Sequence, residues 1–256
     1  MTSSPIPKVL STLRRQRVKA LLMGGQACIL YGAAEFSRDV DVAVAVSPGN
    51  LRRLRGALAQ LGAEPVLFPP LSPQALRRGH ACHFRCRAPG LQGVRLDIMG
   101  AFRGAPPFHR LWARRRRIRL PGVGTVSVMA LVDLVTVKKT QRDKYWPMIR
   151  RLVEADLAAT SRRPHASRVA FWLRECRTPE MLRDLGRRYP AAATKVARAR
   201  PALRAALRSD LERVQRELDR EQARERERDR RYWAPLRREL EAWRLERRQV
   251  VAGGPE

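Results

Sequence analysis

Two aspartates separated by one residue, Asp39 and Asp41, are the strongest candidates for chemistry in this sequence. They stand in the segment DVDVAVAV, where aspartate or alanine alternates with valine. Because successive side chains of a strand point to opposite faces, this alternation predicts a strand from Asp39 to Val46. Both carboxylates would lie on one face and the valines on the other. The spacing therefore brings two carboxylates together above a sheet.

A third carboxylate, Asp97, stands between apolar residues in the segment VRLDIM. The surrounding pattern predicts a β-hairpin made of residues 82–87 and 94–99, with Asp97 in its second strand. Three carboxylates on neighbouring strands could hold two magnesium ions. Such ions clamp a nucleoside triphosphate, activate an acceptor hydroxyl and offset charge on the leaving pyrophosphate. The pattern therefore predicts nucleotidyl transfer, with Asp97 as the candidate base.

A glycine pair precedes the aspartates in the chain. Residues 18–23 predict a buried strand, Gly24 and Gly25 end it, and a helix is expected from Gln26. A strand, a glycine turn and a helix in this order leave backbone N–H groups free at the start of the helix. Gly24 lies fifteen residues before Asp39. The combination is more specific than either motif alone.

Lysine is rare in this chain and is concentrated in one place. Of the 53 lysines and arginines only six are lysine, and three of those six, Lys138, Lys139 and Lys144, fall within seven residues. A lysine ammonium is a compact charge on a flexible stem and binds phosphate as a point charge. The window is therefore a candidate phosphate-binding segment.

These segments resemble a known group of enzymes. GGQACILYGAAEFSRDVDVAV is similar to the signature of the polymerase-β-like nucleotidyltransferase superfamily, and most of all to the minimal AbiEii/AbiGii-type members of toxin–antitoxin and phage-defence systems. The segment DLVTVKKTQRDKYWPMI resembles the later basic helix of that group. The resemblance covers about residues 18–155.

The resemblance implies a magnesium-dependent enzyme that moves a nucleoside monophosphate from a nucleoside triphosphate to RNA, such as a tRNA end, or to a protein hydroxyl. It also implies an antitoxin protein as a partner. The metal ligands and catalytic residues would be Asp39, Asp41 and Asp97. The nucleotide would be bound by Gly24, Gly25, Lys139 and Lys144, with Arg38 near the aspartates and with Lys138 and Arg142 as alternatives to the two lysines.

Composition sets the class of protein. The chain has 256 residues, 44% of them hydrophobic, and a formal net charge of +29. That charge favours phosphate-rich partners such as nucleic acid. The alternative is that the many arginines reflect the base composition of the genome and that the charge has no binding role. No stretch predicts a membrane span or a signal peptide, and the four cysteines form no disulfide framework, so we expect a cytoplasmic protein.

The predicted fold is α/β: a small mixed sheet with flanking helices, followed by a helical C-terminal region. The catalytic core would occupy residues 1–160 and the charged helical region residues 161–256. We expect a helix from Ser127 to Lys139 with Ser127 as its N-cap, a long one-faced helix from Leu203 that breaks or kinks at Pro235, and a disordered tail at residues 251–256.

Some features have more than one interpretation. The cluster of His80, Cys82, His83 and Cys86 suggests zinc, but its spacing does not match the usual structural zinc sites, so we expect a half-buried hairpin there. Two functions compete with the enzyme: a non-catalytic nucleic-acid-binding protein that keeps the fold, and an interaction protein that acts through the C-terminal helix. In both, the aspartates would be dispensable.

Overall fold

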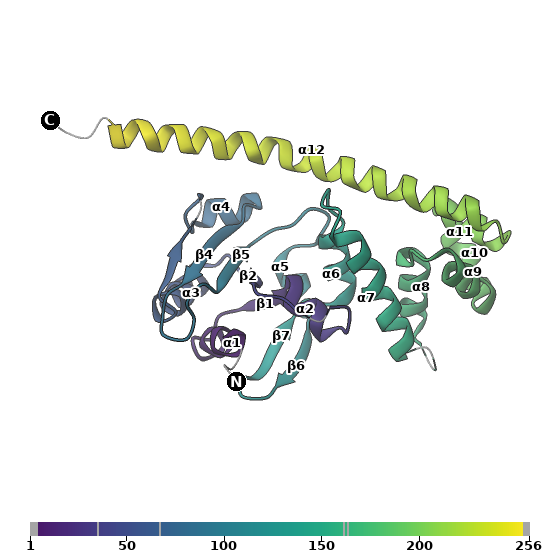
Figure 1. The fold of residues 1–256 in the computed structure, drawn as a ribbon, viewed down its shortest axis with the longest axis horizontal. Coiled ribbons are helices and arrows are strands. Elements are labelled where there is room, and N and C mark those ends of the chain that lie inside the picture. Colours follow the sequence, from purple (N-terminus) through teal and green to yellow (C-terminus); the bar gives the residue numbers. More distant parts are fainter. Residues whose placement is uncertain (1–4, 35, 67, 161, 163, 253–256) are drawn as a thin grey trace. The chain divides into compact units, whose positions relative to one another are not determined.

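The computed structural model describes residues 5–34, 36–66, 68–160, 162 and 164–252, the last six of these by their backbone only. The last four residues of the tail for which the sequence predicts disorder lie outside the described residues. The chain divides into two compact units (Figure 1). The first contains residues 1–29, 36–134 and 231–256, and the second contains residues 30–35 and 135–230.

A seven-stranded mixed sheet forms the centre of the first unit. Its strand order is β3-β4-β5-β2-β1-β7-β6. The pairs β2–β5 and β1–β7 are parallel and the other four pairs are antiparallel. The predicted α/β class and mixed sheet are therefore confirmed. The strands are β1 (Ala20–Met23), β2 (Val40–Val44), β3 (Ala63–Pro65), β4 (Cys82–Cys86), β5 (Arg95–Met99), β6 (Arg116–Leu120) and β7 (Gly124–Val128).

Helices α1 and α3 bury part of the first unit's core. They contact each other, and α1 also contacts β7 while α3 contacts β3, near the two ends of the strand order. The buried side chain of Asn50 joins α3 to the strands by bonding the backbone of Lys19 and of Ala45. The helices assigned to this unit are α1 (Ile6–Arg15), α2 (Gly24–Leu30), α3 (Pro48–Gln60), α4 (Pro73–Arg78), α5 (Phe108–Ala113) and the start of α6 (Leu131–Lys138).

The sheet has one apolar face and one polar face in its centre. Val40 and Val42 on β2, and Leu96 and Ile98 on β5, are at most 1% exposed. On the opposite face Asp41, Arg95, Asp97 and Met99 are partly exposed, whereas Ala43 is buried. This is the alternation that the sequence predicted, and it places the carboxylates on the face opposite the valines.

The prediction of a helix starting at Ser127 is wrong. Ser127 lies in β7, where it pairs with Arg117 of β6, and the helix begins at Leu131. The neighbouring Val126 and Val128 are buried, and Val128 also pairs with Leu22 of β1. Valines that alternate with small polar residues suit a half-buried strand, and this tertiary pairing outweighs the local capping signal of serine.

The second unit is helical. Trp172 is fully buried in its core, and its indole N–H donates to Asp156 over 2.8 Å. The expected domain boundary, residue 160, is the last residue of α7 and lies inside this unit. Its helices are α7 (Tyr145–Thr160), α8 (Ala166–Glu175), α9 (Pro179–Arg188), α10 (Pro190–Ala197), α11 (Pro201–Leu207) and the first part of α12 (Leu211–Ala252).

Two expectations about the last helix, a single helix from Leu203 and a break at Pro235, are wrong, and the alternative of a kink at Pro235 stays a prediction. The apolar stripe that starts at Leu203 is divided between α11 and α12 by a turn in which Ser209 has a φ of +59°. Helix α12 then continues through Pro235. Packing of the following residues on the first unit offsets the missing backbone hydrogen bond, because Leu236 is buried and the Trp243 ring lies 5.0 Å from that of His80. None of the described helices has the length and apolar character needed to cross a membrane.

Candidate active site

The register between β2 and β5 sets Asp41 beside Asp97. The two residues are direct partners in a parallel pair of strands, so their side chains leave the same face of the sheet. Each is flanked along its own strand by buried apolar residues that face the other way. Asp39 comes one residue before β2 and is half-buried. The sequence predicted that Asp97 would lie on a strand next to the paired aspartates, and the register confirms this placement.

The segment that carries Asp39 is tied to α2, which begins at Gly24 although the sequence predicted a start at Gln26. The side-chain amide of Gln26, in α2, donates to the backbone carbonyl of Ser37 over 2.8 Å. The hydroxyl of Ser37 in turn donates to the carbonyl of Asp39 over 3.4 Å. These bonds fix the approach of the chain to β2, and with it the position of Asp39.

The glycine turn lies directly against the Asp41 carboxylate. Met23, the last residue of β1, is the strand partner of Asp41, and Gly24 follows it with a φ of +65°. A Cβ atom on Gly24 would lie 1.8 Å from Oδ2 of Asp41, and one on Gly25 would lie 2.4 Å from Oγ of Ser37. Both distances are far below contact distance, so only glycine fits at these two positions without displacement. The turn thus leaves room for the carboxylate.

Asp97 is held by two side chains of the same sheet face. His83, its antiparallel partner on β4, places Nδ1 2.7 Å from Oδ1 of Asp97, and Arg95 donates through Nε to the same oxygen over 3.0 Å. An ionised carboxylate only accepts hydrogen bonds, so the bond to His83 requires the proton on Nδ1. The Nε2 atom of His83 then has no part in holding Asp97.

The environment keeps Asp97 ionised. Burial raises the pKa of this carboxyl, but the hydrogen bonds and charges of His83 and Arg95 outweigh burial and leave the pKa below its ordinary value. A carboxylate with a lowered pKa is better suited to bind a cation than to accept a proton. This property favours the ligand role predicted for Asp97 over its predicted role as base.

Arg95 links the three predicted carboxylates. Burial lowers the pKa of Arg95, but the bond to Asp97 and the negative charges of Asp97, Asp39 and Asp41 raise it above its ordinary value. The guanidinium of Arg95 therefore interacts electrostatically with all three carboxylates. Sequence analysis missed both Arg95 and His83 as site residues, although alternation within the predicted hairpin places each of them on the same face as Asp97.

The donors fit magnesium by their chemistry, since carboxylate oxygens are the ligands this ion prefers. Across the described residues, no three His, Cys, Asp or Glu side chains are gathered closely enough to hold a metal ion. The cation among the carboxylates in this structure is the guanidinium of Arg95. Asp41 and Asp97 are the pair whose alignment the sheet itself fixes, and they are the first candidates to hold an ion.

The predicted hairpin of β4 and β5 is confirmed. It separates the four residues that suggested zinc, because they lie on different faces of β4 or outside the strand. Cys82 and Cys86 point to the buried face of β4, whereas His83 points to the polar face with Asp97. His80 lies before the strand and bonds Glu239 of α12 through Nε2 over 2.8 Å. The four side chains therefore have different surroundings.

The basic residues predicted to bind phosphate lie in the second unit and separate into two groups. Lys138, Arg142 and Lys144 gather around Tyr145, with their charged groups 4.5, 5.8 and 5.6 Å from the centre of its ring. Lys139 instead donates to Glu175 over 2.8 Å. Tyr145 therefore organises three of the four predicted residues.

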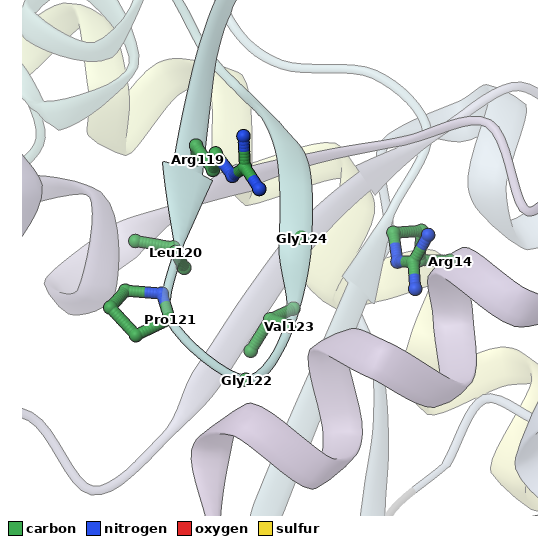
Figure 2. Close-up of a pocket in the computed structure, with 7 residues that line it drawn as sticks. All are labelled: Arg14, Arg119, Leu120, Pro121, Gly122, Val123 and Gly124. Carbon is green, nitrogen blue, oxygen red and sulfur yellow. The ribbon is translucent and has the colours of Figure 1, made fainter.

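Two further features lie in the first unit. Arg38 is exposed and lies over the ring of Phe36, 5.5 Å from its centre. A hollow of about 540 Å³ lies at the turn between β6 and β7, with Arg14 of α1 and Arg119 of β6 on its walls (Figure 2). None of the predicted site residues lines this hollow.

No protein-family model matches the sequence, and no curated protein matches it. Among solved structures, the fold is similar to the crystal structure of a protein from H. pylori that is provisionally described as a nucleotidyltransferase. The two chains are 15% identical, and the alignment covers 84% of this chain and 93% of the other with a TM-score of 0.39. The interpretation of the site rests on its own geometry.

Proposed function

We propose that this chain is a magnesium-dependent nucleotidyltransferase. The observation that carries the proposal is the alignment of Asp41 with Asp97 on adjacent parallel strands, above a glycine turn that leaves room for the Asp41 carboxylate. Paired carboxylates on one sheet face are what this chemistry requires of a protein. Asp41 and Asp97 would hold the ion, with Asp39 as the further ligand.

The proposed reaction transfers a nucleoside monophosphate. An oxygen of the acceptor hydroxyl forms a bond to the α-phosphorus of a nucleoside triphosphate, the bond from that phosphorus to the β-phosphate oxygen breaks, and pyrophosphate leaves. The proton of the hydroxyl passes to solvent. Bound magnesium would supply positive charge that stabilises the leaving pyrophosphate. His83 and Arg95 would keep the Asp97 carboxylate ionised and fix its position, since both bond its Oδ1 atom.

We assign the nucleotide's phosphates to the basic residues around Tyr145. Lys138, Arg142 and Lys144 keep their charges near one ring, whereas Lys139 is paired with Glu175. Gly24, Gly25 and Arg38 stay in the proposal as the nucleotide contacts that the family resemblance implies. Lys144→Ala tests the assignment, because it should raise the KM for the triphosphate while Lys139→Ala should not.

The deciding experiment offers each of four α-labelled nucleoside triphosphates, with magnesium, to the protein together with total RNA and total protein. Label should enter one pool with the wild type and not with Asp41→Asn or Asp97→Asn. Asp184→Asn is the matched control, because Asp184 is 61% exposed and bonds only its neighbour Arg183 among the contacts resolved here. Equal labelling by all four proteins, or none by a folded wild type, would reject the enzyme.

A non-catalytic nucleic-acid-binding protein is the second candidate, and the net charge of +29 favours it. It predicts no transfer and equal RNA affinity for wild type and Asp41→Asn. A more specific form of the enzyme proposal is a toxin that an antitoxin neutralises, with RNA or a protein hydroxyl as the acceptor. Expression of the wild type should arrest bacterial growth and Asp41→Asn should not, whereas equal growth would remove the toxin role.

A further inference from the structure

The second unit contains a large hollow that no predicted site residue except Lys139 lines. It has a volume of about 1110 Å³ and lies among α8, α10 and the first part of α12, which are found at the right of Figure 1. Helices α8 and α10 contact each other directly. Small side chains make the space, since five of the lining residues are alanines: Ala166, Ala170, Ala191, Ala192 and Ala199. We call this hollow the alanine pocket.

The rim of the alanine pocket is strongly basic. Seven cationic side chains line it against three acidic ones, which leaves a formal excess of four positive charges. The cations are Lys139, Arg174, Arg177, Lys195, Arg200, Arg224 and Arg228, and the acids are Glu175, Glu221 and Glu225.

Four of these cations have structural partners. Lys139 bonds Glu175, and Arg228 donates to Glu225 over 2.8 Å. Arg200 is buried and bonds both carboxylate oxygens of Glu221 over 3.1 Å, as well as two backbone carbonyls. Arg177 donates to the carbonyl of Leu218 and lies over the ring of Trp146. The three acids are thus engaged by cations of the same rim.

Three cations are left over, and each comes from a different helix. Arg174 belongs to α8, Lys195 to α10 and Arg224 to α12. All three are exposed, and within the described part of the chain none has a hydrogen bond or an ion pair from its side chain. Three unpaired positive charges around one hollow repel one another, so an anionic ligand that bridges them would be stabilising.

The chemistry of the lining selects the kind of anion. None of the described lining residues is aromatic, so the pocket offers no surface on which a base could stack. Small-molecule sites occupy about 300–1,000 Å³ and are mostly apolar or aromatic, and the alanine pocket is larger and basic. An extended nucleic-acid backbone carries successive phosphates that can pair with three separated cations, and the alanines between those cations leave room for it.

We propose that the alanine pocket binds the phosphodiester backbone of nucleic acid, through Arg174, Lys195 and Arg224. Recognition is by charge and does not depend on sequence. This inference is independent of the proposed catalysis, because it concerns binding by the second unit alone and is measured without turnover.

The test uses the full chain and a labelled single-stranded RNA of about 20 nucleotides, longer than a typical binding site. Fluorescence anisotropy gives Kd between about 50 and 200 mM salt for the wild type and for the triple variant Arg174→Gln, Lys195→Gln, Arg224→Gln. Each lost contact to single-stranded nucleic acid lowers the salt slope of log K by about 0.7, so three contacts lower it by about 2. The ratio of the variant's Kd to that of the wild type should therefore fall about 16-fold across this range.

A second triple variant with the same charge change separates the pocket from the net charge. Arg198, Arg208 and Arg213 are exposed, belong to the same unit and do not line the pocket. Their replacement by glutamine should leave the salt slope close to that of the wild type. Equal slope changes in the two triple variants would overturn the proposal, because the affinity would then come from overall charge.

A third arm distinguishes the backbone from a free nucleotide. Calorimetry with ATP should give the same affinity for the wild type and the pocket variant. If the pocket variant loses ATP binding and keeps the RNA slope, the pocket is a nucleotide site and the proposal fails. Unchanged circular dichroism spectra are expected for both triple variants, since none of the replaced side chains is buried or bonded.

Discussion

Replacing Gly24 by alanine tests the placement of the Asp41 carboxylate most directly. The new Cβ atom would lie 1.8 Å from Oδ2, 2.4 Å from Cγ and 2.6 Å from Cβ of Asp41. Rotation of the carboxylate alone cannot relieve a contact that includes its Cβ, so either the side chain leaves its position or β1 and β2 move apart. In both cases the alignment of Asp41 with Asp97 is lost.

The magnitude has two parts that a matched variant can separate. Gly24 has a φ of +65°, and a left-handed conformation costs an L-residue about 1–2 kcal/mol. The steric overlap adds about 1–3 kcal/mol, as is typical of overpacked sites. Gly122 has a φ of +69° with nothing within 4 Å of its Cβ position, so Gly122→Ala should show the first part alone.

The assay is denaturant unfolding, followed by circular dichroism, together with nucleotidyl transfer by the folded variants. Gly24→Ala should be less stable than Gly122→Ala by about 1–3 kcal/mol. Its transfer rate should fall about 100-fold, because a displacement near 1 Å at a reacting centre has that effect. Equal unfolding midpoints for the two variants would refute the contact between the turn and Asp41. Full activity of Gly24→Ala would refute the role of that carboxylate.

Three further predictions concern other parts of the molecule. Burial raises the pKa of Cys82 to about 11, so only about one thiol in a thousand is ionised at pH 8. Alkylation of Cys82 should therefore be slow in the native protein and fast in denaturant. Equal alkylation rates would contradict the burial of Cys82. Burial raises the pKa of Glu239, but the hydrogen bonds and charges of His80 and Arg78 outweigh burial and leave the pKa below its ordinary value. Ionised Glu239 therefore stabilises the fold above about pH 4.3, and this stabilisation is lost as the pH falls through the lower pKa of the folded state. The difference in unfolding free energy between wild type and Glu239→Gln should shrink from pH 5 to pH 3. A constant difference would exclude this linkage. Arg200→Met removes both hydrogen bonds to Glu221 and the donors to two backbone carbonyls, and leaves only Arg177 near Glu221, 3.7 Å away. This loss should cost about 3–5 kcal/mol in unfolding experiments, and a cost under 1 kcal/mol would show that the pair is not needed.

Local patterns in the sequence were enough to predict the elements of the site. The alternation of aspartate and valine predicted β2 and its polar face, the glycine pair predicted the end of β1, and the segment around Asp97 predicted a hairpin strand. Each of these signals comes from residues close together in the chain, where side-chain periodicity depends on backbone geometry alone. The α/β class follows from the same signals.

Tertiary structure decided what those elements contact. The sequence could not show that His83 holds Asp97, because their contact depends on the register between β4 and β5. Ser127 looked like a helix cap until its pairing with β6 made it part of a strand. Helix α12 continues through Pro235, which the sequence alone predicted to break or kink it, and beyond Pro235 it packs on residues far away in the sequence.

The alanine pocket shows the same division between sequence and structure. Its cations were visible in the sequence only as part of a large net charge, since arginine is common throughout the chain. Which of them are paired depends on contacts between segments that are up to 41 residues apart in the sequence. The sequence therefore determined the chemical groups of this protein and the periodicity of its elements. The pairing of distant segments determined which charged groups are left without an ion-pair partner, because electrostatic and steric interactions depend on distance in space rather than along the chain.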